Sequence, residues 1–292
     1  MSAEFDYHTA FSRNIGWVSK TEQEALRHKR VAIAGLGGVG GDHLVTLARM
    51  GVGNFSIADM DVFELANFNR QFGATLNTIG QEKAGVMRDV VQSINPEGTN
   101  RVFPSGINQD NLDDFLQGVD LYMDSLDFYA LDIRRDVFRA CYERNIPAVT
   151  AAPLGMGTAL LVFMPGRMSF EEYFDFASAK TWDDAMTKFL IGLSPSMMQM
   201  KYLIRESSLD FEERKGPSRA MGISLAAGVA GSAAIKILLG RGELVCAPRG
   251  LHFDAYRNRM RITWRPGGNR NPVQRVMFAM AKSMIAKQKK AD

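Results

Sequence analysis

A short β-branched run that leads into a glycine-rich turn is the feature that most constrains the fold of this chain. The run spans Val31–Ala34, and a helix-like segment over Asp42–Met50 follows the turn directly. The turn contains Gly35, Gly37, Gly38 and Gly40. Glycine lets a backbone turn tightly and approach a phosphate, and the amides at the start of the following helix then face the anion. The sequence thus predicts a nucleotide-binding α/β fold, with a turn that serves packing alone as the alternative.

An acidic residue ends the next predicted strand. Phe55–Ala58 leads into Asp59 about 20 residues after the glycine turn, the place where Rossmann-type folds hold a ribose. Asp59 is therefore expected to accept hydrogen bonds from ribose hydroxyls, unless it only caps a turn. The nearby Asp61 has two interpretations: it orients the loop, or it helps to position the substrate.

Polar and cationic residues follow this acid in a compact block. Asn67, Asn69, Arg70 and Gln71 stand close together, and Lys83 opens a predicted helix. A dinucleotide enzyme has no need of these residues, whereas a triphosphate site needs positioned cations because charge builds on phosphate oxygens. Arg70 offers a planar fork and Lys83 a point charge, while Asn67 and Asn69 either donate to the same oxygens or fix the loop. Gln71 has no role separable from structure, and a surface helix position is the alternative for Lys83.

Together these segments resemble the MoeB/ThiF/ubiquitin-activating superfamily, whose members adenylate carboxylates with ATP. The matching segments are Gly35–Gly40, Ala58–Asp61, Asn67–Gln71, Gly80–Lys83 and Asp124–Asp127. Upstream, Phe11–Asn14 is similar to the N-terminal element of that family, and Met221–Gly240 is similar to its late Gly/Ala-rich helix. The resemblance implies ATP and Mg²⁺ as cofactors. It also implies a ThiF-like α/β fold, Rossmann-like, with a mostly parallel sheet continued by antiparallel strands.

The resemblance also implies roles for two further residues. Asp127 corresponds to the carboxylate linked to magnesium, an ion that prefers one or two carboxylates plus substrate phosphates. Phe128 stands where the family has asparagine, and Asp124 is expected to act behind Asp127. Arg13 is expected to reach the triphosphate of the neighbouring subunit in a homodimer. An exposed arginine on an N-terminal arm is the alternative for Arg13.

The two cysteines restrict the transfer chemistry. Cys141 and Cys246 are the only cysteines and form no Cys-x-x-Cys, so we expect no structural zinc. Relatives that form thioesters place a nucleophilic cysteine after the strand that here ends at Met164, in a segment where this chain has none. We therefore predict two buried structural thiols and direct transfer of the acyl group to an amine, an amide or an external thiol.

Alternating patterns predict a parallel sheet with helical crossovers. Strands are expected near 30–35, 54–58, 100–103, 119–123 and 147–151, with helices near 40–51, 80–94, 110–117 and 129–144. Thr21-Glu-Gln-Glu24 predicts a helix-starting capping box. Further on we expect a strand over 158–164, helices over 169–205 with breaks at Gly192 and Pro195, a mobile loop over 206–217 and a helix over 219–239. Strands near 243–247, 250–255 and 259–264, and a basic amphipathic helix from Asn271, complete the pattern.

We expect a single ThiF-type adenylation domain over 1–292. Its parts are an N-terminal arm (1–29), a nucleotide-binding half (30–164), a crossover or substrate segment (165–218) and a C-terminal part (219–292). The net charge of +3 does not argue for nucleic acid or a membrane, and no apolar run reaches the ~20 residues that span a bilayer. The N-terminus lacks the features of a signal peptide, so we expect a cytoplasmic protein. The methionines at 197–200 are interpreted as a pliable core or dimer interface, with a substrate groove as the alternative.

From these observations we predict an ATP-dependent adenylyltransferase that works as a homodimer. Its carboxylate substrate is the C-terminus of a small ubiquitin-like protein or of a peptide, or a small-molecule acid. Two other classes stay open: a non-catalytic partner subunit of a heterodimeric activating enzyme, and a nicotinamide or flavin oxidoreductase. The presence of Arg70, Lys83 and Asp127 together argues against the first class. The block from Asn67 to Gln71 argues against the second.

Overall fold

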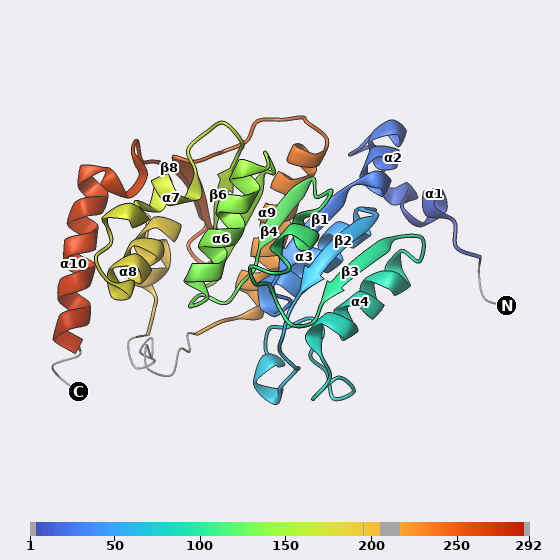
Figure 1. Cartoon of the computed structure of the whole chain (residues 1–292), viewed down its shortest axis with the longest axis horizontal. Helices are drawn as coiled ribbons and strands as arrows, with labels where there is room; N and C mark the ends of the chain where they lie inside the picture. Colours follow the sequence, from blue (N-terminus) through green and yellow to red (C-terminus); the bar gives the residue numbers. More distant parts are fainter. Residues whose placement is uncertain (1–3, 195, 205–216, 289–292) are drawn as a thin grey trace.

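The computed structural model describes residues 4–194, 196–204 and 217–288. Its centre is an eight-stranded sheet with the strand order β3-β2-β1-β4-β5-β6-β7-β8 (Figure 1). The strands are β1 (Arg30–Ala34), β2 (Asn54–Ala58), β3 (Thr99–Phe103), β4 (Leu121–Asp124), β5 (Ala148–Leu154), β6 (Gly157–Phe163), β7 (Arg249–Asp254) and β8 (Arg259–Trp264). The first five pair in parallel, whereas β6, β7 and β8 continue the sheet antiparallel. The predicted α/β fold class is confirmed.

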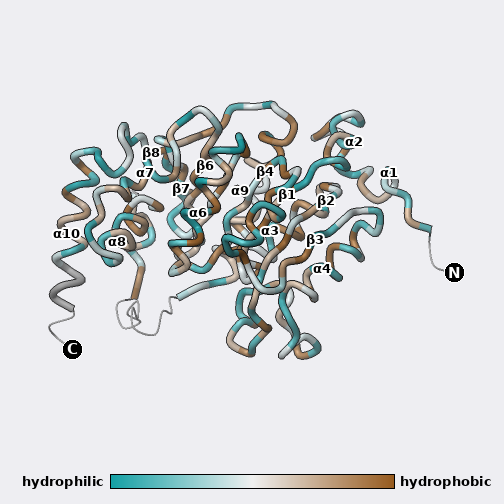
Figure 2. Tube along the Cα trace, in the orientation of Figure 1, coloured by the Kyte–Doolittle hydropathy of each residue, from teal (hydrophilic) through white to brown (hydrophobic). Residues whose placement is uncertain are grey.

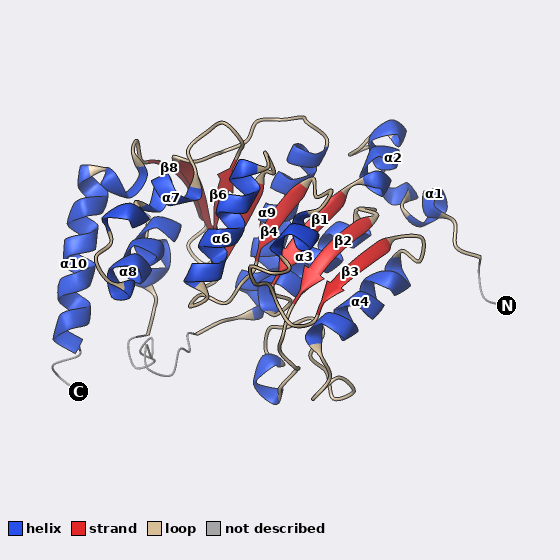
Figure 3. Cartoon of the chain, viewed as in Figure 1, coloured by secondary structure: helices blue, strands red, loops and turns tan. Residues whose placement is uncertain are grey.

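Helices cover both faces of this sheet (Figure 3). They are α1 (Tyr7–Ala10), α2 (Lys20–His28), α3 (Gly38–Arg49), α4 (Lys83–Ile94), α5 (Leu112–Leu116), α6 (Leu131–Glu143), α7 (Phe170–Phe174), α8 (Trp182–Leu193), α9 (Ala220–Leu238) and α10 (Pro272–Gln288). Side chains of α3, α4 and α9 join one buried cluster, and side chains of α5 to α8 join another. The long crossovers between parallel strands place helices on the two faces in this way.

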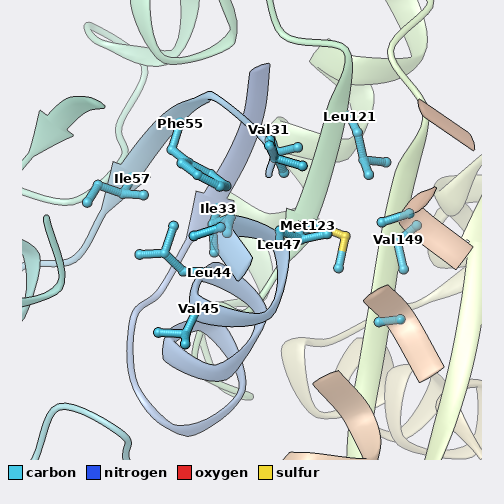
Figure 4. Packing of buried hydrophobic residues seen from close by; sticks show 14 of the residues in the cluster. Val31, Ile33, Leu44, Val45, Leu47, Phe55, Ile57, Leu121, Met123 and Val149 are labelled. Atoms are coloured by element: carbon cyan, nitrogen blue, oxygen red, sulfur yellow. The ribbon is translucent and has the colours of Figure 1, made fainter. Parts of the chain in front are cut away.

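Strand β1 shows how the sequence pattern produces two cores. Val31 and Ile33 pack with α3 residues such as Leu44 in the first cluster, as Figure 4 shows. Ala32 and Ala34 belong to the cluster on the opposite face. Successive side chains of a strand point to opposite faces, so a strand covered on both sides has an unbroken apolar sequence. Hydrophobic residues accordingly gather along the central strands (Figure 2).

Helix α9 is built from small residues and packs against α3, β5 and β6. Ala226, Ala230 and Ala234 are fully buried there. Among the described helices, α9 alone is long and apolar enough to cross a membrane, with a mean hydropathy of 1.6. This differs from the expectation that no apolar run has the length that spans a bilayer. Half of that window is buried inside the fold, the environment of a core helix.

Three local expectations were wrong. The capping box lies at Ser19 and Glu22, whose side chains each accept the other residue's backbone N–H, so Thr21 falls inside the first turn of α2. No strand forms over 243–247, a described stretch in which Cys246 and Ala247 are buried and a single backbone hydrogen bond runs from Ala247 to Val162 of β6. Helix α8 continues through Gly192, which allows the ring of Phe174 to pack closely against the helix backbone.

The remaining late elements agree with the pattern more closely. Short helices occupy much of 169–205, and a helix runs from Pro272 to Gln288 against α8. Lys282 of α10 binds Asp184 of α8, with 2.7 Å between Nζ and Oδ1. Val273 and Val276 face outward, so the apolar side of α10 is only partly covered. Pro195 and all of the predicted mobile loop except Pro217 lie outside the described residues.

Candidate active site

The candidate site lies where the parallel strands β1, β2 and β4 end. Strand β1 pairs with β2 on one side and with β4 on the other, all in the same direction. The glycine turn after β1, Asp59 after β2 and Asp127 after β4 therefore meet at one edge of the sheet. Open α/β sheets bind ligands at this edge.

The glycine turn is packed so closely that side chains are excluded from it. Gly35 has a φ of +86°, and a Cβ atom there would lie 2.1 Å from the carbonyl oxygen of Ser125. A Cβ atom on Gly40 would lie 1.7 Å from the carbonyl oxygen of Gly35. Helix α3 begins at Gly38, and Gly37 before it supplies no side-chain cap. The first amides of α3 therefore have no side-chain acceptor at the N-cap, which suits an anion.

Asp59 fastens this turn to the loop after β2. Its Oδ2 accepts a hydrogen bond from the N–H of Leu36 at 2.6 Å, and its Oδ1 accepts one from Asp61 at 2.8 Å. Burial raises the pKa of Asp59, while both backbone hydrogen bonds and the charge of Lys83 act in the opposite direction. Each carboxylate oxygen has a second lone pair, so the turn contact leaves acceptor capacity for a ribose hydroxyl. The capping and ribose interpretations are thus compatible.

Lys83 is buried at the start of α4. Only 7% of its side chain is exposed, against 65% for its partner Asp61, and Nζ lies 3.0 Å from Oδ2. The backbone N–H of Lys83 also donates to the carbonyl of Asp61. The alternative of a surface lysine is therefore wrong. A buried ammonium needs an anionic partner, and here that partner is an exposed carboxylate with which a phosphate could compete.

The asparagine and arginine block forms its own loop network. Nη1 of Arg70 donates to the carbonyl of Ala66 at 2.9 Å and to Oδ1 of Asn69 at 2.8 Å. Asn69 in turn donates to the carbonyl of Ser218, just before α9, at 3.0 Å. Asn67 is buried and accepts a hydrogen bond from the backbone of Glu64. Of the two interpretations of Asn67, loop fixation has direct structural support.

Gln71 has a position that the sequence did not reveal. It is buried beneath the glycine turn, and its Nε2 would lie 3.4 Å from a Cβ atom on Gly37. Its Oε1 is closed to solvent and has no hydrogen-bond partner in the described part of the chain. Gln71 therefore forms part of the floor under the turn.

Asp127 is held by a buried ion pair behind it. Its side chain is exposed, and Oδ1 accepts a hydrogen bond from the N–H of Tyr129 at 2.9 Å. Nη2 of Arg134 donates to the carbonyl of Asp127 at 3.0 Å, and Nε of Arg134 binds Asp124 at 2.9 Å. Phe128, the departure from the family pattern, packs its ring near Phe189 of α8. Arg134 was missed by sequence reasoning; its signal is an arginine in the first turn of the helix after the Asp-x-x-Asp segment.

No group of three or more His, Cys, Asp or Glu side chains among the described residues could hold a metal ion. Magnesium at Asp127 would therefore take its other ligands from nucleotide phosphates and water, as this ion commonly does. The exposed carboxylate of Asp127 fits such a role. Its Oδ1 is partly engaged by Tyr129, and the ion pair behind it fixes the backbone.

Arg13 lies away from these residues within one chain. It is exposed on a short 3₁₀ helix (Ser12–Asn14), and the neighbouring Asn14 contacts the carbonyl of Arg49 at the C-terminal end of α3. The glycine turn is at the opposite end of that helix. The structure therefore does not bring Arg13 into its own chain's site, and both a role in a partner subunit and an exposed arm position stay open.

Both cysteines are buried, as predicted. Cys141 lies in α6, and Cys246 lies in an irregular stretch rather than in the expected strand. Burial raises the pKa of each thiol, so both stay protonated at neutral pH.

Comparison with known proteins gives a consistent family assignment. The ThiF family model matches residues 11–275. The tRNA threonylcarbamoyladenosine dehydratase of Bacillus subtilis is 33% identical over 142 residues, 48% of this chain and 55% of that protein. Molybdopterin-synthase adenylyltransferase of Escherichia coli is 33% identical over 141 residues, 48% of this chain and 56% of that protein. The matched part thus spans about half the length of these curated relatives.

A solved structure supports the fold over a longer part of the chain. E. coli MccB, solved with ATP, has a TM-score of 0.64 and 19% sequence identity. The similarity covers 90% of this chain and 71% of that one.

Proposed function

Because this chain belongs to the ThiF family, we propose that it is an ATP-dependent adenylyltransferase that activates a carboxylate as an acyl adenylate. One observation carries the proposal. The uncapped start of α3, the half-buried Asp59, the buried Lys83 and the exposed Asp127 converge at one edge of the sheet. This edge offers an anion site, acceptors for a ribose, a cation and a carboxylate for magnesium, the set that an ATP complex needs.

The proposed reaction starts with attack of a substrate carboxylate oxygen on the α-phosphorus of ATP. The bond from that phosphorus to the bridging oxygen breaks, and pyrophosphate leaves. Lys83 and the free donors of Arg70 would stabilise negative charge on the phosphate oxygens. Asp59 would orient the ribose, and the glycine turn would bring backbone amides to the phosphates. Bound at Asp127, magnesium would supply further charge neutralisation.

We propose that the substrate acid is the C-terminus of a small ubiquitin-like protein or of a peptide, or a small-molecule acid. The names of the relatives point to different substrates, a tRNA nucleoside in one case and a molybdopterin synthase in another, so family membership alone does not choose. We also propose a homodimer in which Arg13 of one subunit reaches the nucleotide of the other. Its exposed position away from its own chain's site supports this arrangement.

Calorimetry on the purified chain tests the nucleotide assignment. We expect magnesium-dependent binding of ATP, little binding of NAD or FAD, and a loss of ATP affinity of at least about tenfold in Lys83→Ala. Lys29→Ala is the matched control, since Lys29 also pairs with one aspartate, Asp120, but before β1 at the opposite edge. Preferential binding of NAD or FAD would favour an oxidoreductase. ATP binding without ATP–pyrophosphate exchange in the presence of candidate acids would favour a non-catalytic subunit.

A further inference from the structure

A second cluster of reactive side chains lies on the antiparallel part of the sheet. Oγ of Ser196 is 2.6 Å from Nδ1 of His252 on β7, a short contact, and Oγ of Ser194 is 3.1 Å from the same nitrogen. Asp254 lies two residues beyond His252 on β7, so both side chains point to the same face of the sheet. His252 and Asp254 are buried, whereas Ser196 is only half-buried. A hydroxyl, an imidazole and a carboxylate are thus grouped outside the nucleotide site.

The hydrogen bonding of this cluster is incomplete in a specific way. Burial lowers the pKa of His252 to about 4, against the opposing charge of Asp254, so the ring is neutral at neutral pH. A neutral ring that accepts from Ser196 at Nδ1 carries its hydrogen on Nε2. Nε2 of His252 and Oδ2 of Asp254 are both buried, and neither has a hydrogen-bond partner in the described residues. A buried donor and a buried acceptor that lack partners reduce stability. The other oxygen of Asp254, Oδ1, accepts a hydrogen bond from the N–H of Arg257 at 3.0 Å, which fixes the carboxylate in place.

The backbone beside Ser196 is strained. Met197 has a φ of +46° and a ψ of 34°. This is the left-handed backbone conformation, which residues other than glycine and asparagine rarely adopt. The N–H of Met197 donates to the carbonyl of Ser194 at 3.0 Å, and the 3₁₀ helix Met198–Lys201 follows directly. Strained backbone of this kind gathers at functional sites.

The cluster lies at the same edge of the sheet as the nucleotide site. Asp254 pairs with Gly157, at the start of β6, and β6 follows the turn after β5. The hydroxyl of Tyr202, which follows the 3₁₀ helix, accepts a hydrogen bond from Met156 in that turn at 2.8 Å. The same turn touches the start of α9, since a Cβ atom on Gly222 would lie 2.8 Å from the carbonyl oxygen of Gly155.

Helix α9 completes the connection to the glycine turn. Ile223, the residue after Gly222, packs against Gly38: a Cβ atom on Gly38 would lie 2.9 Å from Cδ1 of Ile223. The glycine turn therefore contacts α9, α9 contacts the β5–β6 turn, and that turn contacts the segment that carries Ser196.

We propose that Ser196 is a nucleophile, activated by His252, that accepts the acyl group from the adenylate. Oγ of Ser196 forms a bond to the acyl carbon, its proton passes to Nδ1 of His252, and the bond from the acyl carbon to the AMP oxygen breaks. AMP leaves with the electron pair of that bond, and an ester remains on Ser196. An amine that later attacks the ester takes the acyl group. The bond from the acyl carbon to Oγ breaks, Oγ takes the proton from His252, and the proton that the amine nitrogen loses passes to the neutral His252 and from there to water. Asp254 stabilises the imidazolium in between.

The transfer step rests on the proposed function, but the nucleophilicity of Ser196 does not, and a fluorophosphonate probe tests it without ATP. Such a probe forms a bond between phosphorus and an activated serine Oγ, releases fluoride and leaves the proton on the base. We expect the probe on the peptide that contains Ser196, detected by mass spectrometry of the digested full chain. Ser196→Ala should lose the label completely, and His252→Gln should lower the labelling rate at least about 100-fold.

Ser194→Ala is the matched control, because Ser194 contacts the same nitrogen but is itself buried; it should keep the label on Ser196. Thermal melting of each variant checks that it folds. Even if His252→Gln does not fold, labelling of the unmodified chain shows whether Ser196 is nucleophilic. An unlabelled Ser196 in the folded chain would overturn the proposal, as would equal rates in a folded His252→Gln variant. Calorimetry with ATP separates either result from failure of the proposed function.

Discussion

Arg134 and Asp124 form an ion pair closed to solvent, with 2.9 Å between Nε and Oδ2 and side chains that are 3% and 2% exposed. The same guanidinium donates to the carbonyls of Leu126 and Asp127, so it holds the loop that follows β4. The ring of Phe189 lies against it, 4.8 Å from the guanidinium carbon to the ring centroid. The candidate magnesium ligand is therefore positioned by a charge pair that is closed to solvent.

Arg134→Ala should lower the free energy of unfolding by roughly 3–5 kcal/mol, because it leaves the carboxylate of Asp124 buried without its partner. Urea denaturation measures the change. Arg135→Ala is the matched control: Arg135 binds Glu171 through two hydrogen bonds, but both side chains are 30% exposed. That variant should lose only about 0–1 kcal/mol. Equal losses in the two variants would contradict the importance of burial at Arg134.

Arg13→Ala and Asp127→Ala should complement each other if Arg13 acts across a subunit boundary. Each variant alone should have little activity, whereas mixed subunits can form hybrid dimers in which one site keeps both residues. ATP–pyrophosphate exchange measured after subunit exchange, with the substrate acid present, reads out the recovery. No recovery despite demonstrated subunit exchange would place Arg13 in its own chain's site or outside catalysis.

The double variant Cys141→Ala, Cys246→Ala should still form the adenylate and complete transfer. Both thiols are buried, and burial raises the pKa of each, so neither is suited to attack an acyl adenylate. Each substitution should cost roughly 1 kcal/mol of stability through a small cavity. Pyrophosphate exchange and product formation are measured separately. A folded variant that exchanges pyrophosphate but cannot complete transfer would restore a thioester mechanism.

His43→Leu should reduce the sensitivity of the fold to acid. Both ring nitrogens of His43 are buried in α3 without hydrogen-bond partners in the described residues, and burial lowers the pKa of His43 to about 3. The unfolded chain therefore binds a proton that the folded chain does not. Stability is lost as pH falls below the ordinary value of 6.5 towards that folded value. The difference in unfolding free energy between about pH 7 and about pH 4.5 should shrink in this variant.

His8→Gln is the control for that measurement, because the side chain of His8 is exposed. It should keep the pH dependence of the unmodified chain. An unchanged pH dependence in His43→Leu would mean that His43 has a partner when the protein is in solution.

The elements that sequence reasoning located best are those with local signals. Glycines that permit a tight turn, an acid at the end of a strand and a lysine at the start of a helix stand close together in the chain, so the sequence could predict that Asp59 and Lys83 lie near one another. The strand expected over 243–247 was wrong because buried apolar residues have the same composition whether or not their backbone pairs. A glycine in a helical pattern either breaks the helix or lets a neighbour pack closely, and composition could not show that Gly192 does the second.

Pairs of residues that are far apart in the chain could not be predicted from the sequence, for a different reason. Arg134 meets Asp124 only after α6 folds back over β4, and Ser196 meets His252 across a separation of more than fifty residues. Nothing in either local sequence marks the partner. The sequence offered turn capping as one role of Asp59, but its partner in that role, the N–H of Leu36, was visible only in the folded structure.

Helix α3 has one further consequence, since its two ends serve different parts of the molecule. The first residue of α3, Gly38, belongs to the glycine turn. At the other end, the hydroxyl of Tyr7 in the N-terminal arm donates to the carbonyl of Gly51, just past the end of α3, at 2.6 Å. A helix of twelve residues is a stiff rod about 18 Å long. A displacement of this helix along its axis at the glycine turn would therefore also move its other end, which contacts the arm that carries Arg13. If the chain works as the proposed homodimer, a neighbouring subunit that holds the arm would restrict movement of the glycine turn when pyrophosphate departs, which would couple assembly to turnover.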